Sequence, residues 1–245
     1  MRDESLAPRP GASRGFGLAE RLADRLELLE TGALDRRELE TNLADLARLN
    51  RLPGGVGASI TAAERLVPRT AGARLIDVGT GAADIPVAFA RRGWSVVGLD
   101  SNRRVLDVAR RRTEGIAGIE VVAGDGAALP FADATFDVAH CSLLLHHLEP
   151  ASAVGMLREL RRVSRAGVVV NDLRRGWLTL AATAASVALL GRCRATRHDG
   201  LLSVRRSYTI AELDRRLEQS GLVVCHRSAA WMPRVVTAAV ARAAE

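Results

Sequence analysis

The segment from Leu75 to Pro86 constrains the fold most, because an apolar run ends there in an acid and a glycine-rich turn, and a helical pattern follows. This order is typical of the first strand, loop and helix of a nucleotide-binding α/β domain. Gly79 and Gly81 fill the first and third places of a dinucleotide fingerprint, but Asp84 stands at the sixth. Because a carboxylate at a helix start repels a pyrophosphate, the loop disfavours NAD and favours a ligand with positive charge. A plain strand–turn–helix with two glycines is the alternative.

Strand and helix patterns alternate after this point. Strands are expected at 73–79, 94–100, 118–123, 135–143 and 166–172, and helices at 83–92, 102–114, 151–164 and 209–220. Two further strands are expected near 221–227 and 233–241, although frequent alanine makes a helix the alternative for the last. The pattern predicts an α/β fold, a doubly wound, Rossmann-like, seven-stranded and mostly parallel sheet with helices on both faces.

The residues before this domain predict a helical cap over 18–68. Leucines at helical spacing between 18 and 50 indicate two amphipathic helices, with a break at Thr31-Gly32 and a restart at Asp35. A short third helix is expected over 59–67. Residues 1–17 are polar and rich in Pro, Gly and Arg, without an apolar signal region, so they are expected to be disordered. The remaining residues, 69–245, form the predicted main domain.

An insertion at 173–208 lies within that domain and contains an almost wholly apolar stretch, 177–190. Its length falls short of the roughly 18–20 residues that a bilayer span requires. No membrane span is therefore expected, and the stretch is predicted to be a buried or pocket-lining helix. An ordinary core helix is the alternative.

Composition excludes some classes of function. The net charge is +7, but all 35 basic residues are arginines scattered along the chain, and aromatic residues make up only 3%. Stacking platforms for nucleic acid are therefore scarce, and no nucleic-acid partner is expected. The three cysteines are far apart and show neither a disulfide framework nor metal-ligand spacing. They fit a reducing cytoplasm, and no metal site is predicted.

Two acidic residues at predicted strand ends are candidate ligand contacts. Asp100 closes the second strand 23 residues after Asp77, where an acid can accept hydrogen bonds from both hydroxyls of a ribose. The alternative for Asp100 is a helix N-cap. Asp125, between two glycines after the third strand, can accept from an exocyclic amine, and a simple Asp-Gly turn is its alternative.

Histidines supply the candidate catalytic groups. His146 and His147 follow the fourth predicted strand, and ligands of open α/β sheets bind outside the carboxyl ends of strands. Either can take a proton from an acceptor hydroxyl, or simply line the pocket or cap a helix. His198, next to Asp199, is the second candidate, although the pair is expected to be a polar loop. Arg205, Arg206 and Tyr208 are expected to bind an acceptor or to lie in a solvated loop.

Together these motifs resemble the class I S-adenosylmethionine-dependent methyltransferases over roughly residues 70–172. The matching segments are Asp77-Val78-Gly79-Thr80-Gly81, Asp100, Gly124-Asp125 with Leu129-Pro130-Phe131, and Phe136-Asp137 through His146-His147-Leu148. Asp84-Ile85, Leu129-Pro130-Phe131 and the region of Asn50 are similar to the quinone-biosynthesis methyltransferases. The run Arg197–Tyr208 resembles methyltransferases of polyketide and phenolic-lipid gene clusters. Ala83 stands where the family usually has glycine or another small residue, and this is expected to be harmless.

The resemblance implies S-adenosylmethionine as cofactor. It implies cofactor contacts at Asp77, Gly79, Thr80, Gly81, Asp100, Ser101, Asn102, Gly124, Asp125, Gly126, Cys141 and Ser142. Apolar faces of the cap and the insertion favour a hydrophobic small-molecule acceptor, phenolic, polyketide or quinone-type, with O-methylation as the expected reaction. C-methylation of a quinone precursor, an RNA or protein acceptor, and a binding protein without turnover are the alternatives. The motifs of amino-group methyltransferases on DNA or protein and of RNA cytosine methyltransferases are absent, which weakens the macromolecular reading.

Overall fold

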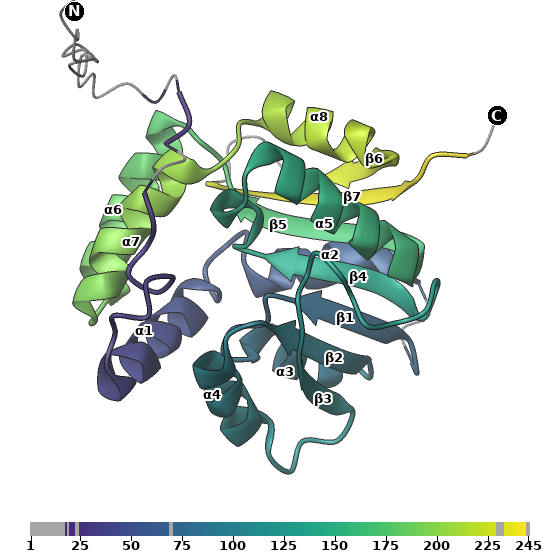
Figure 1. Cartoon of the computed structure of the whole chain (residues 1–245), viewed down its shortest axis with the longest axis horizontal. Helices are drawn as coiled ribbons and strands as arrows, with labels where there is room; N and C mark the ends of the chain where they lie inside the picture. The colour runs from purple at the N-terminus through teal and green to yellow at the C-terminus, as the bar shows by residue number, and fades with distance from the viewer. Residues whose placement is uncertain (1–17, 19, 23–24, 69–70, 229–232, 244–245) are drawn as a thin grey trace, which may run out of the picture.

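Seven strands form one sheet in the order β3-β2-β1-β4-β5-β7-β6 (Figure 1). The strands are β1 (Arg74–Val78), β2 (Ser95–Asp100), β3 (Ile119–Ala123), β4 (Phe136–Ser142), β5 (Ser164–Leu173), β6 (Leu222–Arg227) and β7 (Arg234–Ala241). The computed structural model describes residues 18–243 except 19, 23–24, 69–70 and 229–232. The first five strands pair in parallel, and β7 runs antiparallel to both β5 and β6. The predicted mostly parallel sheet is confirmed, and its last element is a strand.

The helices are α1 (Arg36–Leu49), α2 (Val56–Leu66), α3 (Asp84–Ala90), α4 (Arg103–Thr113), α5 (Pro150–Val163), α6 (Trp177–Leu190), α7 (Arg194–Arg206) and α8 (Ile210–Gln219), with a 3₁₀ turn, η1, at Leu145–His147. Residues of α5 and α8 pack in one apolar cluster with one face of the sheet, and residues of α2 and α3 pack in another with the opposite face. Alternation within β1 explains the two layers, because Ile76 belongs to the first cluster and Leu75 to the second.

A separate group of helices, α1, α6 and α7, lies at the end of the sheet toward which the arrowheads of β1 and β4 point (Figure 1). Leu39 and Leu43 of α1 pack there with Val105 of α4 and with Cys193 and Ala195 at the start of α7. The carboxyl ends of the parallel strands therefore face a helical cap, which contains both the N-terminal helix and the insertion.

The first predicted helix of the cap is wrong in the residues that the structure describes between 18 and 30. These residues form an irregular segment followed by a turn at 28–32, and we call residues 20–22 and 25–34 the strap. Tertiary hydrogen bonds replace helical ones: the Leu22 amide donates to the Arg205 carbonyl, and the Leu28 amide donates to Asp199 Oδ1. The leucine spacing favours a helix here, but tertiary contacts of the folded chain override this local preference. The expected disorder of residues 1–17 concerns residues outside the described part.

The insertion also differs from expectation. Residues 197–206 lie in α7, not in a loop, and α6 is not buried, because Thr179 and Val187 are its only buried residues. Other residues of α6, including Ala182, Thr183 and Ser186, line a cavity. The pocket-lining prediction for 177–190 is thus confirmed and the buried one is wrong. None of the described helices is long and apolar enough to cross a membrane.

A buried carboxylate in α1 holds the insertion in place. Asp45 Oδ2 accepts hydrogen bonds from the amides of Arg192 and Cys193, both at 2.7 Å, and from the Thr196 hydroxyl at 2.9 Å. Its other oxygen pairs with Arg48. These donors surround the first turn of α7, so Asp45 caps that helix from a different element, where the helix dipole favours negative charge.

We expect Asp45→Ala to lower the free energy of unfolding by at least about 2 kcal/mol, because it leaves buried amides without acceptors. Urea denaturation measures this change. Asp107→Ala removes an exposed carboxylate that pairs with Arg110 on α4, and it should change stability by less than about 0.5 kcal/mol. Equal losses in the two variants would contradict the capping role.

Candidate active site

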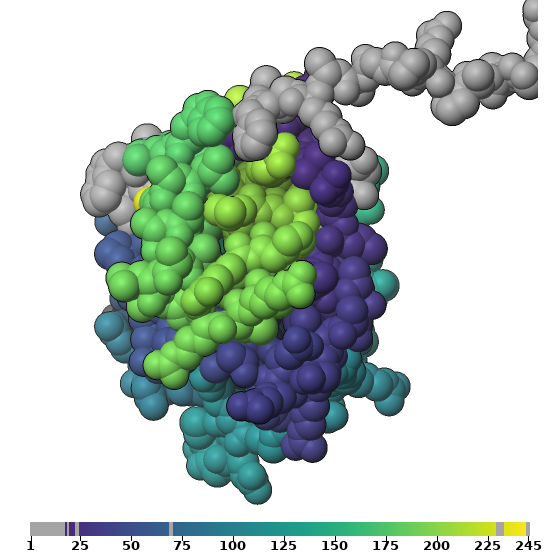
Figure 2. Space-filling view, turned by 90° about the vertical axis from the view of Figure 1, so that its left-hand side faces the viewer, coloured from purple at the N-terminus to yellow at the C-terminus, as the bar shows by residue number. Residues whose placement is uncertain are grey.

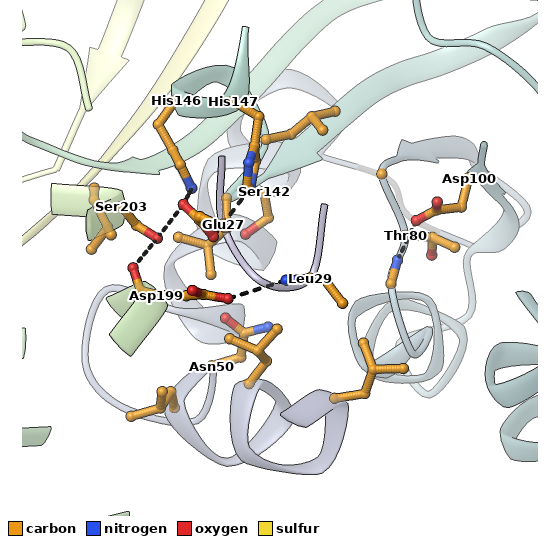
Figure 3. Close-up of a pocket in the computed structure, with 18 of the residues that line it drawn as sticks. Glu27, Leu29, Asn50, Thr80, Asp100, Ser142, His146, His147, Asp199 and Ser203 are labelled. Carbon is orange, nitrogen blue, oxygen red and sulfur yellow. Dashed lines mark hydrogen bonds and ion pairs between the residues drawn. The ribbon is translucent and has the colours of Figure 1, made fainter. Parts of the chain in front are cut away.

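A cavity of about 860 Å³ lies between the sheet and the cap. One side is formed by the loops that follow β1, β2 and β3, and the other by η1 after β4 together with α1, α6, α7 and the strap. Figure 3 shows Thr80 and Asp100 on the first side and His146 and Glu27 on the second. Because this volume lies near the upper end of ligand pockets, it can hold two moderate ligands side by side.

The loop after β1 is anchored from behind. Asp77 is buried, its Oδ2 accepts from the Thr80 hydroxyl at 2.8 Å, and its Oδ1 lies 2.7 Å from His140 Nδ1. Gly79 and Gly81 have φ values of 72° and 56°, the left-handed region that favours glycine. A Cβ on Gly81 would meet no atom within 4 Å, so this position opens onto the cavity.

Ala83 is less harmless than expected. It has a φ of 56° and ψ of 28° at the N-cap of α3, and its side chain is fully buried. A left-handed conformation costs a non-glycine residue about 1–2 kcal/mol. The loop therefore carries backbone strain at the place where the chain turns from β1 into α3.

Asp100 lines the cavity with both carboxylate oxygens already in use. One accepts from the Gly81 amide at 3.1 Å and the other from the Asn102 amide at 2.9 Å. Burial, first of all, raises the pKa of this carboxyl, and the Asn102 and Gly81 amides oppose that rise. The N-cap of α4 is Asn102, whose side chain accepts from the Arg104 and Val105 amides. Each carboxylate oxygen has a second lone pair, so Asp100 can still accept from a ligand.

The turn after β3 is both a local turn and part of the cavity wall, the two alternatives that the sequence left open for Asp125. Asp125 Oδ1 accepts from the Ala127 amide at 2.9 Å, which closes a local turn, and Gly124, Asp125 and Gly126 all line the cavity. A Cβ on Gly126 would lie 2.9 Å from a methyl of Val78. Glycine therefore lets this turn approach the first loop closely.

The structure brings most of the residues expected to bind the cofactor to the wall of the cavity. Those that line it are Gly79, Thr80, Gly81, Asp100, Ser101, Asn102, Gly124, Asp125, Gly126 and Ser142. Asp77 and Cys141 do not line it; both are buried, Asp77 in the anchor described above and Cys141 in the core on one face of the sheet. Asp77 thus positions the loop rather than facing the cavity.

A histidine–carboxylate pair lies on the other side of the cavity. His146 Nδ1 is 2.6 Å from Asp172 Oδ1, and the His146 amide donates to Asp172 Oδ2 at 3.1 Å. Asp172 is the second-last residue of β5, which pairs in parallel with β4, and η1 follows β4. The carboxyl ends of two neighbouring strands therefore bring the pair together, although 26 residues separate them.

The second ring nitrogen of His146 faces the strap. His146 Nε2 lies 3.5 Å from Glu27 Oε1, and Glu27 also accepts from the Ser203 hydroxyl at 2.7 Å (Figure 3). Burial lowers the pKa of His146, but the Asp172 and Glu27 carboxylates outweigh burial and raise it to about 10. His146 is therefore protonated at neutral pH while Glu27 stays beside it.

His147 continues the charged cluster. Its Nδ1 lies 3.2 Å from Glu30 Oε1, and its Nε2 lies 3.9 Å from Glu27 Oε2. Arg206 pairs with Glu30 and donates to the His147 carbonyl at 3.1 Å. Burial raises the pKa of Glu30, but the bonds to His147 and Arg206 more than reverse this and hold it well below its usual range. Arg206 is thus buried in an ion pair, not in the solvated loop expected as one alternative.

The other sequence candidates lie away from this cluster. His198 is largely exposed and does not line the cavity, although its Nδ1 lies 2.8 Å from Asp199 Oδ1. Asp199 instead accepts from the Leu28 and Leu29 amides and so fixes the strap. The Tyr208 hydroxyl donates to the Leu148 carbonyl at 2.7 Å.

Glu27, His146 and His147 form the group of potential metal ligands found in the described part of the chain. Their ligand atoms lie within 4.8 Å of one another, a grouping that the sequence analysis did not predict. The same atoms lie beside the cavity, so a divalent ion there would compete with the proton on His146.

The sequence analysis did not predict several residues of the site, among them Glu27, Asn42, Asp172 and Arg234. Asp172 could have been predicted, because the expected strand 166–172 ends at this residue and the neighbouring strand precedes His146. The other three lie on the strap, α1 and β7, and no motif connects them to the loops. Asn42 Oδ1 is a buried acceptor with no partner among the described residues, and Asn42 lines the cavity.

Arg234 ties the two sides of the cavity together. Its guanidinium donates to Ser142, Asn50 and Asn171, at 2.8, 2.7 and 3.0 Å. Asn50 in turn donates to Asp84 Oδ2 at 3.0 Å. Burial lowers the pKa of Arg234 to about 10, against the opposing Asp172 and Asp84 carboxylates.

Comparisons with known proteins agree with this arrangement. A family model described as a methyltransferase domain matches residues 75–167. The chain is 30% identical to a demethylmenaquinone methyltransferase of Clavibacter sepedonicus over 191 residues, which are 68% of this chain and 77% of that protein.

Solved structures show the same fold. A S-adenosylmethionine-dependent methyltransferase from Aquifex aeolicus is similar with a TM-score of 0.60 and 19% identity, covering 84% of this chain and 98% of that one. Magnesium protoporphyrin IX methyltransferase from Synechocystis PCC 6803, with bound S-adenosylhomocysteine, gives a TM-score of 0.57 at 18% identity, covering 77% and 84%. The sheet and site define a Rossmann-like α/β domain. The chain belongs to the class I S-adenosylmethionine-dependent methyltransferases, in the family of demethylmenaquinone methyltransferase.

If Asp100 binds the sugar of a nucleoside ligand, Asp100→Ala should weaken the binding of S-adenosylhomocysteine by about 1–3 kcal/mol, the loss of charge-assisted hydrogen bonds. Asp100→Asn retains one acceptor oxygen and should lose less. Titration calorimetry measures both, with Asp107→Ala as the control. Unchanged affinity in Asp100→Ala would rule out this contact.

His146 should also make stability depend on pH. Its pKa in the folded chain, about 10, lies above the ordinary value of 6.5, so its contribution is complete below pH 6.5 and is lost as pH rises toward 10. We expect urea midpoints of the native chain to fall more steeply between pH 7 and 10 than those of His146→Gln. Parallel pH profiles would show that the ring is not held as an imidazolium.

Proposed function

We propose that this protein transfers the methyl group of S-adenosylmethionine to a hydroxyl of a hydrophobic small molecule of phenolic, polyketide or quinone type. The observation that carries the proposal is a single cavity whose one side has the glycine loops and Asp100, and whose other side has the His146–Asp172 pair. The three free cysteines fit a reducing cytoplasm as the place of the reaction.

The donor side fits a nucleoside that carries positive charge. The open Gly81 backbone would lie against the ligand, Asp100 would accept from the sugar hydroxyls, and Asp125 would accept from the adenine amine. Asp84 lines the cavity at the first residue of α3, and burial raises the pKa of its carboxyl. An ammonium group nearby would favour its ionised form. S-adenosylmethionine would supply the activated methyl group on a sulfonium, a good leaving group.

The acceptor side fits an apolar molecule with at least one hydroxyl. Leucines of α1 and the strap supply apolar wall, among them Leu29, Leu43 and Leu46. Asn42 Oδ1, which has no partner in the described chain, would accept from a second polar group of the acceptor. A concave, mainly apolar wall suits a small molecule better than a nucleic acid or a protein segment.

His146 is the proposed general base, and Glu27 stands in the place of the acceptor hydroxyl. When the acceptor hydroxyl displaces Glu27 from His146 Nε2, one of the two carboxylates that raise the pKa of the ring is removed. The departing Glu27 carboxylate takes the proton from Nε2 and leaves as the neutral acid. The neutral Nε2 then takes the hydroxyl proton, and Asp172 stabilises the imidazolium that forms. The oxygen is left to attack the methyl group in line with the departing sulfur. His147 would position Glu27 rather than remove the proton.

C-methylation of a quinone precursor is the second candidate. Similarity to a demethylmenaquinone methyltransferase favours it. The same base serves both reactions, because removal of a phenol proton also activates the neighbouring ring carbon. The position of the transferred methyl group decides between them.

The experiment is methyl transfer from S-adenosylmethionine labelled in its methyl group to a panel of phenols, naphthols and naphthoquinols. His146→Gln and Asp172→Asn should lower kcat about 10²- to 10⁴-fold, the usual contribution of general acid–base catalysis, and leave S-adenosylhomocysteine affinity unchanged. His226→Ala, on β6, is the matched control. Label that reaches no member of the panel, or full activity in His146→Gln, would contradict the proposal.

Glu27→Gln tests the placeholder role. It removes one carboxylate from His146, so the pKa of the ring falls and the acid limb of the kcat/KM profile should move to lower pH. An unchanged acid limb would mean that Glu27 does not control the protonation of His146.

A further inference from the structure

The α6–α7 hairpin presents an apolar outer surface next to a row of arginines. In α6, Trp177, Leu178 and Leu189 are 61%, 54% and 83% exposed, and Ala181, Ala185 and Ala188 are exposed between them. These positions recur every three or four residues, so they share one side of the helix, about 18 Å long at 1.5 Å per residue. We call these six residues the α6 stripe.

The neighbouring helix α7 carries exposed basic residues. Arg194 and Arg197 are exposed and lie on the same side of α7 as exposed Leu201, and Arg192 is exposed in the connection between the helices. Figure 2 shows α6 and α7 side by side on one face of the molecule. Between Leu173 and Ile210 the single acidic residue is Asp199, which is buried. The surface is therefore apolar and positively charged, with no exposed acid in this segment to neutralise it.

The opposite side of α6 lines the cavity. Ala182, Thr183, Ser186 and Val187 are lining residues, and they lie behind the stripe on the same helix. Only the thickness of one helix therefore separates the apolar outer surface from the acceptor side of the cavity. A molecule dissolved in a lipid layer against this surface would be next to the cavity without crossing water.

We propose that the α6 stripe and the arginines of α7 dock this protein on the surface of an anionic phospholipid membrane. Apolar side chains would enter the boundary between headgroups and acyl chains, where Trp177 at the end of the stripe is well placed. The arginines would reach the lipid phosphates, and their aliphatic stems would cover apolar surface. Delivery of a lipid-dissolved acceptor through this contact rests on the proposed function, whereas membrane binding does not.

Vesicle flotation of the full chain tests the docking without any acceptor or donor. Vesicles of equal parts phosphatidylcholine and phosphatidylglycerol should carry the protein, and pure phosphatidylcholine should carry less, with binding that weakens in high salt. Leu189→Glu and Trp177→Ser should each lower the partition coefficient about tenfold, and Leu189 is exposed enough for its replacement to spare the fold. Val223→Ser, a partly exposed apolar residue on β6, is the matched control.

The charge contribution has its own pair of variants. Arg194→Gln with Arg197→Gln should weaken binding to anionic vesicles about fivefold for each arginine. Arg158→Gln with Arg215→Gln changes the net charge equally on exposed positions of α5 and α8, and it should leave binding nearly unchanged. Equal effects of the two pairs would show a nonspecific attraction and overturn the proposal.

Two other results would also overturn it. The first is that the native chain does not float with anionic vesicles. The second is that the native chain forms a concentration-dependent dimer, that Leu189→Glu abolishes this dimer, and that vesicles capture no protein. The second result would assign the stripe to another copy of this chain. The activity of the His146 variants is measured on acceptors dissolved in water, without vesicles. Failure of membrane binding can therefore be distinguished from failure of the proposed function.

Discussion

The contact between His146 and Asp172 is the constraint on which the acceptor side of the site depends. It joins the carboxyl ends of two neighbouring parallel strands, and Asp172 bonds both the ring and the amide of His146. The ring can therefore point its second nitrogen only toward the strap. Once a buried ring carries a proton, a second carboxylate beside it is favourable, which explains why Glu27 lies there. The strap is thus held in part by the attraction between Glu27 and the protonated ring of His146.

A second buried network gives the donor side a comparable rigidity. Asp77, His140, Ser59 and Asn171 are hydrogen-bonded in sequence across β1, β4, α2 and β5, and Arg234 joins Asn171 to the cavity wall. Buried polar groups of this kind are costly unless every member has a partner. Their satisfaction fixes the carboxyl ends of the strands relative to one another, and with them the loops that line the cavity.

Much of the sheet could be predicted from the sequence, because its signals are local. Strand length, alternation and the glycine turn after Asp77 are all written within a few residues, and the observed strands match. The cap could not be predicted in the same way. Leucines of the strap are spaced as in a helix, but Asp199 and Arg205 bond the strap backbone from about 170 to 183 residues away in sequence, and the strap is not helical. The sequence of 197–206 predicts a loop because no local residue caps α7. The acceptor for the first turn of α7 is Asp45, which lies on another helix.

The site divides along the same line. Loop residues such as Gly81 and Asp100 belong to a motif and were found, whereas Glu27 and Asn42 reach the cavity only through tertiary structure. Asp77 belongs to the motif too, yet it supports the loop from within the fold. A motif therefore indicates where the ligand-binding loops lie. Only the folded structure shows which residues of the motif face the cavity and which hold the loop in place.

We propose that one cavity holds the donor against the loops of β1 to β3, with its sulfonium methyl group on the side of His146. A crystal structure with S-adenosylhomocysteine tests this most directly. We expect sugar hydroxyls within hydrogen-bond distance of Asp100 and a sulfur on the side of the cavity that faces His146 Nε2. A nucleoside bound elsewhere, or a sulfur turned away from His146, would contradict it.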